Sequence, residues 1–282
     1  MFQIWVRIAG AISFVIGSPL FWSVLRRLNP QRYREKVPIL FGFYSSFSEI
    51  ENESPWQSEG WISKSIEKLE DAKFNNANES DIVQNGTSSA CYALPTVLVN
   101  SIACKRLCKV LDYGGGTGDV YFQIKRSFSH IQNVEWHVVD DAKLGNVGKI
   151  YTENEDNLYF HTTVPKDIEF DVVHTATVFQ YIEHYDAILL DLLKNSPEYL
   201  CFMRFWATNC PNNYVTTENV HGKNTPFKVL DIATFNTWIE RQGYRKLFGG
   251  PCSFKASERF VDIPRKYIPQ GDVNLVYQLH SE

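Results

Sequence analysis

The chain has 282 residues, of which 44% are hydrophobic and 14% aromatic, so it can bury a sizeable core and is not a disordered chain. Its formal net charge is -4, and no block rich in Lys and Arg follows residue 36, which argues against a dedicated nucleic-acid-binding protein. The six cysteines form neither a CxxC pair nor a zinc-like spacing with histidine, so we expect buried free thiols in a reducing compartment and no metal site.

The amino-terminal segment, residues 1–37, stands apart because residues 8–25 form an uncharged, mostly apolar run flanked by arginines. A transmembrane helix needs about twenty apolar residues, and glycines and Pro19 interrupt this run. Three interpretations stay open: membrane contact or anchoring through residues 1–30, a helix packed on the protein's own body or on a second subunit, and a cleaved signal peptide. The basic residues behind the run favour a cytoplasmic body at the inner face of a membrane.

Residues 38–107 are expected to form a region of helices and loops ahead of the main domain. Residues 38–60 lack sustained periodicity and indicate a loop, whereas residues 61–74 space their apolar side chains along one helical face. Residues 88–107 are compatible with a second helix, with Pro95 near its start or at a kink.

The main domain, residues 108–282, alternates apolar strands with amphipathic helices. Expected strands cover 109–113, 134–139, 158–160, 171–175, 199–204, 244–248 and 273–280, and expected helices cover 119–128, 142–151, 180–193 and 229–242. This alternation predicts an α/β fold with a mostly parallel, seven-stranded sheet. Because no helix separates the last two strands, we expect an antiparallel edge strand. Residues 208–228 indicate an inserted loop that could form a lid.

The stretch KVLDYGGGTGDVYF, residues 109–122, places glycines between a strand and a helix, where backbone can approach a ligand closely. A P-loop is excluded, since no Gly-Lys pair follows at the required spacing. A dinucleotide-binding loop is disfavoured, because Asp119 stands at the third glycine position and would repel a pyrophosphate. A nicotinamide oxidoreductase therefore stays open only as a weak alternative.

The remaining pattern, DxGxGxG at residues 112–118, resembles the first motif of the class I S-adenosylmethionine-dependent methyltransferases. The strand VEWHVVDD and the stretch FDVVHTATVFQYI follow in the order that this family uses. The resemblance implies a Rossmann-like class I methyltransferase fold with a helical amino-terminal extension and S-adenosylmethionine as cofactor. It implies these cofactor-binding residues: Asp112, Gly114, Gly115, Gly116, Gly118, Asp140 and Thr175.

Two neighbouring acids end the VEWHVVDD strand, and they are expected to have different roles. A carboxylate at this strand tip can accept hydrogen bonds from both ribose hydroxyls. The other acid is placed to cap the helix that follows. We assign Asp140 to the ribose and Asp141 to the cap, with the reverse assignment as the alternative.

A narrower resemblance links residues 38–282 to methyltransferase-like proteins encoded with bacterial surface-polysaccharide genes. It rests on FGFYSSFSEI, the Gly60-Trp61 pair, LDYGGGTGD and VFQYI, and it departs at Asp140, where a glutamate is expected. The resemblance implies O-methylation of a saccharide, a lipid-linked sugar or a related small acceptor. The apolar amino terminus is not covered by it.

For the acceptor side, histidine suits proton removal near neutral pH, and His184 is the candidate catalytic base. Tyr181, Arg204 and His221 are the candidate substrate-binding residues. The alternative function is a non-catalytic, membrane-associated binding protein that retains the methyltransferase fold.

Overall fold

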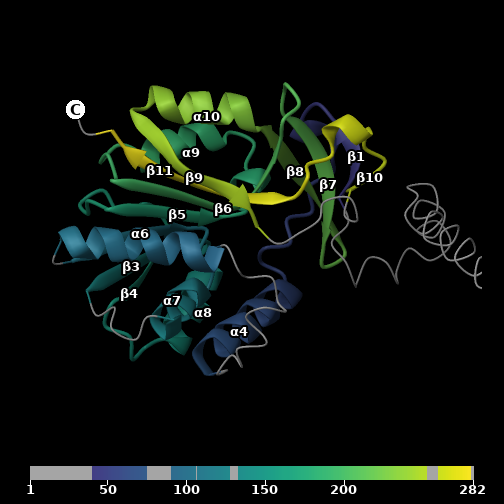
Figure 1. Cartoon of the computed structure of the whole chain (residues 1–282). Helices are drawn as coiled ribbons and strands as arrows, with labels where there is room; N and C mark the ends of the chain where they lie inside the picture. Colours follow the sequence, from purple (N-terminus) through teal and green to yellow (C-terminus); the bar gives the residue numbers. More distant parts are fainter. Residues whose placement is uncertain (1–39, 75–89, 106, 128–132, 253–259, 281–282) are drawn as a thin grey trace, which may run out of the picture.

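The computed structural model describes residues 40–74, 90–105, 107–127, 133–252 and 260–280 (Figure 1). The predicted membrane-contacting segment, residues 1–37, lies outside the described residues. Among the residues that are described, no helix combines the length and the apolar character needed to cross a membrane.

The main sheet has the strand order β4-β3-β2-β5-β6-β11-β9. These strands are β2 (Cys108–Tyr113), β3 (Val134–Val139), β4 (Leu158–His161), β5 (Val172–Ala176), β6 (Tyr199–Thr208), β9 (Tyr244–Pro251) and β11 (Asp272–Leu279). From β4 to β6 all neighbours are parallel, which confirms the predicted α/β fold with a mostly parallel sheet. The antiparallel strand, however, is not at the edge: β11 lies between β6 and β9 and pairs with both.

Helices cover both faces of this sheet, as Figure 1 shows. They are α4 (Glu59–Phe74), α6 (Ala90–Cys104), α7 (Asp119–Ser127), α8 (Ala142–Tyr151), α9 (Tyr185–Leu192) and α10 (Ile232–Arg241). Leu69 of α4 and Leu98 of α6 pack with Trp136 in one core cluster, and Phe235 of α10 packs with Phe202 in the cluster on the other face. The helices of residues 38–107 therefore share a core with the main sheet.

Four further strands extend the sheet beyond the seven predicted. They are β1 (Leu40–Tyr44), β7 (Tyr214–Val220), β8 (Lys223–Asp231) and β10 (Phe260–Val261), which gather at one end of the molecule in Figure 1. β8 joins β6 through the parallel pair Ala207 and Leu230, while β7 pairs with both β8 and β1.

The two loop predictions in this region had different outcomes. Residues 45–58 are irregular apart from the 3₁₀ turn Phe47–Glu49, as predicted, but residues Leu40–Tyr44 form β1. The predicted loop lid at 208–228 was wrong, because most of it belongs to the β7–β8 hairpin. The hairpin turns at His221 and Gly222, which have φ angles of +50° and +82°, and every residue of β7 is buried. The valines and threonines of β7 suit a pleated strand once both neighbours and a core are present. Polar composition alone indicates a loop here, because it carries no information about those neighbours.

Two helices begin later than predicted. The predicted helix 229–242 begins at Ile232, because Asp231 ends β8 and its side chain accepts hydrogen bonds from the backbone N–H groups of Ala233 and Thr234. The predicted helix 180–193 is split: residues Phe179–Tyr181 form a 3₁₀ turn and α9 begins at Tyr185. The helix 142–151 is confirmed at both ends.

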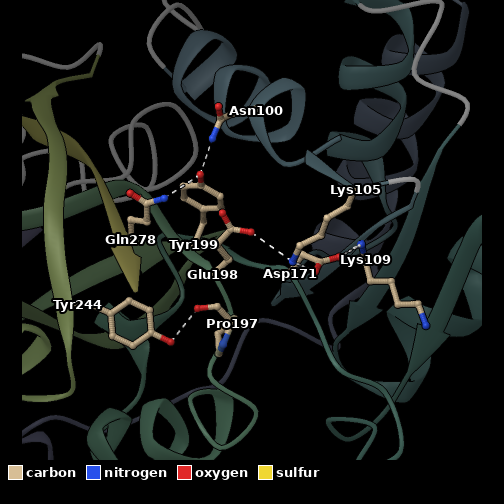
Figure 2. A network of polar contacts seen from close by, with 9 residues as sticks. All are labelled: Asn100, Lys105, Lys109, Asp171, Pro197, Glu198, Tyr199, Tyr244 and Gln278. Carbon is tan, nitrogen blue, oxygen red and sulfur yellow. Dashed lines mark hydrogen bonds and ion pairs between the residues drawn. The ribbon is translucent and has the colours of Figure 1, made fainter. Parts of the chain in front are cut away.

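A polar network fixes the edge of the sheet opposite the glycine loop (Figure 2). Asp171, at the start of β5, accepts hydrogen bonds from Lys105 Nζ at 2.5 Å and from the Lys109 backbone N–H at 2.8 Å. Tyr199, at the start of β6, accepts from Asn100 at 2.5 Å and from Gln278 at 3.1 Å. These contacts hold α6 and the amino ends of β5 and β6 in register.

The described cysteines are free, but only some of them are buried as predicted. Cys108 and Cys201 are buried, and burial raises the pKa of the Cys108 thiol to about 11. Cys104, the last residue of α6, is exposed.

Candidate functional site

The glycine loop follows β2 and turns sharply into α7. Gly114, Gly116 and Gly118 have φ angles of +76°, +59° and +84°, which side-chain-bearing residues rarely adopt. A Cβ on Gly114 would lie 2.1 Å from Cγ2 of Val178, so this glycine allows the loop to touch the turn after β5. By contrast, a Cβ on Gly116 would have no described heavy atom within 4 Å. The loop is thus closed against the protein at Gly114 and open at Gly116.

Asp112 lies beneath the loop and supports it. Its carboxylate is buried and accepts hydrogen bonds from His174 Nδ1 at 2.7 Å and from Trp136 Nε1 at 3.1 Å. A Cβ on Gly115 would lie 2.4 Å from Asp112 Oδ2, so the loop backbone rests directly on this carboxylate. His174 is the buried hydrogen-bond partner of Asp112. A direct contact between Asp112 and a cofactor stays a prediction.

Asp140 directly follows β3 and faces the loop. Its Oδ2 accepts a hydrogen bond from the Gly116 N–H at 2.7 Å, and its Oδ1 accepts one from the Asp141 N–H at 2.7 Å. The pKa of Asp140 is raised overall. Burial is the largest cause, and the charges of Asp112 and Asp141 add to it, while the two backbone hydrogen bonds act in the opposite direction. The carboxylate is therefore oriented by backbone donors beside the open position of the loop.

Asp141 caps α8, as the sequence predicted. Its Oδ1 accepts a hydrogen bond from the Lys143 N–H at 2.9 Å. Its Oδ2 accepts a second bond from Gln57 Nε2 at 3.0 Å, and Lys143 Nζ donates to the Gln57 carbonyl at 2.9 Å. Residues before α4 are thereby fastened to the carboxyl edge of the sheet. No local pattern indicates this attachment, because the contact spans 84 positions.

Two strained residues lie on neighbouring strands, one just after β5 and the other within β6, where its pairing with β11 shifts register. Thr177 and Arg204 have φ angles of +61° and +52°. Thr177 Oγ1 donates to the Arg204 carbonyl at 3.3 Å, and the Arg204 N–H donates to Asn274 Oδ1 at 2.9 Å. The Arg204 Nε lies 3.7 Å from Oδ2 of buried Asp272, while 42% of the Arg204 side chain is exposed. Left-handed backbone at non-glycine residues persists only where neighbours enforce it, and it concentrates at functional sites.

A series of aromatic ring contacts connects the 3₁₀ turn Phe179–Tyr181 with the β7–β8 hairpin. Tyr181 makes edge contacts with Trp56 and Phe227, at ring-centroid distances of 4.7 and 5.2 Å. Trp56 also contacts Trp61 at 4.9 Å, and Trp61 lies 6.0 Å from His221 at the hairpin tip. Two of the predicted substrate-binding residues, Tyr181 and His221, are therefore joined by the tryptophans.

Tyr181 has a further partner that sequence reasoning missed. Its hydroxyl donates a hydrogen bond to Glu218 of β7, a glutamate that is only 7% exposed. The position of Glu218 depends on the hairpin, so no local pattern distinguished it from a surface acid.

Thr175 and His184 are the remaining predicted site residues. The Thr175 hydroxyl is buried in β5, and within the described residues it has no hydrogen-bond partner. His184 is exposed at the amino end of α9, and among the described residues no hydrogen bond or ring contact joins its side chain to the glycine loop. Their predicted roles stay predictions.

A cavity of about 480 Å³ lies at the carboxyl end of β4. Its lining includes His161, Thr162, Thr163 and Asp167. The Asp140 N–H donates to the His161 carbonyl at 3.1 Å, so the cavity adjoins the tip of β3. Polar groups and space are thus available on the strand next to Asp140, the residue expected to bind ribose.

Comparisons with known proteins show similarity at the level of structure only. No family model matches the chain, and no curated protein matches it either. Among solved structures, magnesium protoporphyrin IX methyltransferase from Synechocystis PCC 6803 with bound SAH is 13% identical, with a TM-score of 0.51 over 80% of this chain and 97% of that chain.

Two further solved structures are similar at lower scores. An S-adenosylmethionine-dependent methyltransferase from Clostridium acetobutylicum ATCC 824 is 8% identical, with a TM-score of 0.45 over 78% of this chain and 99% of that chain. The mitomycin 7-O-methyltransferase MmcR is 13% identical, with a TM-score of 0.42 over 81% and 69% of the two chains. With the Synechocystis enzyme, this chain shares the Rossmann-like fold of the class I methyltransferases.

Proposed function

We propose that the protein is an S-adenosylmethionine-dependent methyltransferase. The observation that carries the proposal is the open backbone at Gly116, together with the Asp140 carboxylate that its N–H holds in place. A glycine at φ +59° with open space above its Cα lets a ligand approach the backbone closely. The sequence motif at residues 112–118 and the shared fold with the Synechocystis enzyme support the same proposal.

The residues present fit this cofactor. Asp140 retains acceptor capacity for the two ribose hydroxyls, because each of its oxygens accepts one backbone hydrogen bond and has a second lone pair. The neighbouring cavity at His161 and Thr162 suits the adenine base. When bound, the cofactor supplies a sulfonium-linked methyl group for in-line displacement. The chain's own task is to align the acceptor and to exclude water.

On the acceptor side, Tyr181, Arg204 and His221 are the proposed substrate-binding residues. Tyr181 contacts Trp56, and His221 contacts Trp61. Aromatic rings beside hydrogen-bonding side chains suit the ring and the hydroxyl groups of a sugar. His184 is the proposed base that removes the hydroxyl proton. We therefore propose O-methylation of a saccharide, a lipid-linked sugar or a related small acceptor, as the resemblance to the polysaccharide-associated proteins implies.

Cofactor binding is the first experiment. Calorimetry with S-adenosylhomocysteine should show a saturable site that Gly116→Arg abolishes and Asp140→Ala weakens. Melting curves of both variants establish that they remain folded. Unaltered affinity in both folded variants would refute the site, and protection by NAD but not by S-adenosylhomocysteine would revive the oxidoreductase alternative.

A non-catalytic, membrane-associated binding protein is the second candidate. Cell extracts supplied with methyl-labelled cofactor distinguish the two functions, because labelled glycan or lipid product requires turnover. Deletion of residues 1–30 tests the membrane contact: we expect release from membranes with cofactor binding retained, whereas a full-length chain already in the soluble fraction contradicts it.

A further inference from the structure

Residues 53–57, which we call the strap, run from the β7–β8 hairpin to the start of α8. At the hairpin, the Glu53 N–H donates to the Asn224 carbonyl at 3.0 Å, and the Asn224 N–H donates to Glu53 Oε2 at 3.0 Å. At α8, Gln57 Nε2 donates to Asp141 Oδ2 at 3.0 Å. Two separate elements therefore hold the two ends of one short segment.

The middle of the strap spans the end of β2, where the glycine loop begins. Trp56 contacts Tyr181 in the turn that follows β5, whereas the next residue, Gln57, bonds to Asp141 just beyond β3. β2 lies between β3 and β5 in the sheet. Neighbouring strands are about 4.8 Å apart, so two consecutive residues that reach both flanking strands bridge the strand between them.

The strap bridges the loop without filling the space beside it. A Cβ on Gly116 would have no described heavy atom within 4 Å, although the strap is attached on both sides of the loop. The helix that follows the strap is fixed to the loop as well, because the Ser65 carbonyl of α4 accepts a hydrogen bond from Thr117 Oγ1 at 3.2 Å. Loop and strap therefore leave room for a ligand between them.

The two attachments of the strap differ in strength. Toward the hairpin, the backbone pair at Glu53 is reinforced by buried Pro55 and by the ring contacts of Trp56. Toward α8, the attachment consists of two polar contacts of exposed Gln57: its bond to Asp141, and the bond from Lys143 Nζ to its carbonyl at 2.9 Å. Solvent-exposed polar contacts contribute little free energy and open readily. The α8 attachment is therefore the one that opens first.

We propose that the strap is a cover over the glycine loop, and that it opens at its α8 end to admit and release a nucleoside ligand. In the closed state the ligand lies between loop and strap, and water is kept from the reacting atoms. Closure also sets Trp56 against Tyr181, so the strap completes the proposed acceptor site. Gln57 and Lys143 are positioning residues that act through this closure. The inference rests on the proposed function only for the identity of the ligand.

The rates of ligand exchange test the cover. Stopped-flow binding of S-adenosylhomocysteine to the full-length protein gives the association and dissociation rate constants, kon and koff. Gln57→Ala removes the bond to Asp141, and Lys143→Met removes the second bond but keeps the Lys143 backbone N–H that the α8 cap uses. In both variants we expect kon and koff to rise together by roughly two- to tenfold, the equivalent of one hydrogen bond, because a larger fraction of the protein is open.

A side chain that merely contacts the ligand changes koff alone, so the rise in kon is the signature of a cover. Gln278→Ala is the matched control. It removes a glutamine side chain that donates to Tyr199 at 3.1 Å, at the sheet edge opposite the glycine loop, and it should change neither rate constant. Melting curves establish that the variants remain folded.

Hydrogen exchange of the free protein tests the cover without a ligand. In Gln57→Ala and Lys143→Met, amides of residues 53–58 and 114–118 should exchange about twofold faster or more, because opening uncovers both segments, while amides of β9 and β11 stay unchanged. A rise in koff alone, unchanged rate constants in both variants, or equal changes in Gln278→Ala would overturn the cover. A wild-type protein that binds no S-adenosylhomocysteine refutes the proposed function instead, and exchange at residues 114–118 then decides the cover by itself.

Discussion

Replacing Gly116 by alanine separates the backbone strain of the loop from its role in ligand binding. At φ +59° an alanine costs about 1 kcal/mol relative to glycine, because its Cβ crowds the carbonyl oxygen in left-handed backbone. No described heavy atom lies within 4 Å of the new Cβ, so no packing penalty adds to this. For a chain of this size about 1 kcal/mol corresponds to a fall of roughly 2–4 °C in Tm.

The effect on binding is expected to equal or exceed the effect on stability. The added methyl group fills the space that we assign to the cofactor, and a steric conflict of about 1–3 kcal/mol corresponds to roughly a fivefold to 150-fold loss of affinity. Calorimetry with S-adenosylhomocysteine measures the affinity, and thermal melting of the free protein measures the stability.

Gly222 supplies the matched control. It has a φ of +82° and likewise no described heavy atom within 4 Å of the position that a Cβ would take, but it lies at the β7–β8 hairpin tip. Gly222→Ala should therefore lose the same stability and keep its affinity. Gly114→Ala adds a steric conflict with Val178 and should lose about 2–5 kcal/mol of stability. If Gly116→Ala and Gly222→Ala bind S-adenosylhomocysteine equally well, the open side of the loop is not the cofactor site.

Three further predictions concern stability. Asp141→Ala removes the α8 cap and should lower the free energy of unfolding in urea by about 1 kcal/mol, and an unchanged value would show that the cap is not needed. Burial, with His161 and Lys109 nearby, lowers the pKa of His137 from 6.5 to about 4, so the unfolded chain binds more protons below pH 6.5 and stability falls as the pH drops toward 4. The loss approaches about 3 kcal/mol, and His137→Leu should show a shallower decline between pH 7 and pH 4.5; parallel pH profiles would contradict this. Tyr181→Phe leaves the buried Glu218 without its hydroxyl donor and should destabilise the protein by about 1–3 kcal/mol, more than the milder Glu218→Gln, and equal melting temperatures for all three proteins would refute that contact.

The main sheet was predictable because its signals are local. Buried parallel strands are short apolar runs, and the helices between them carry one apolar face, so both appear within windows of about ten residues. The helix at 142–151 was predicted to the residue because Asp141 marks its start with a cap. The glycine loop was predictable for a similar reason, since backbone at positive φ favours glycine, and three such positions within five residues leave a local trace in the sequence.

The second group of strands was not predictable from the same signals. β7 is polar by composition, and its Thr216, Thr217, Glu218 and Asn219 are buried only because β1, β8 and the 3₁₀ turn surround it. β1 is far along the chain from its partner β7, since Leu40 pairs with Glu218, 178 positions later. Pairing between segments so far apart along the chain does not produce a hydrophobic periodicity in either of them.

What the sequence determined by itself is the chemistry that one short segment can carry: the glycines at 114, 116 and 118, the capping acid at 141 and the acid at 140. What only the tertiary structure decided is which distant groups meet there. Asp112 turned inward to His174 and Trp136, Gln57 of the segment before α4 reached Asp141, and Ser65 of α4 accepted a hydrogen bond from Thr117 of the loop. The physical reason is that backbone conformation follows from a few neighbouring residues, whereas side-chain partners follow from how strands and helices far apart in the chain share one core.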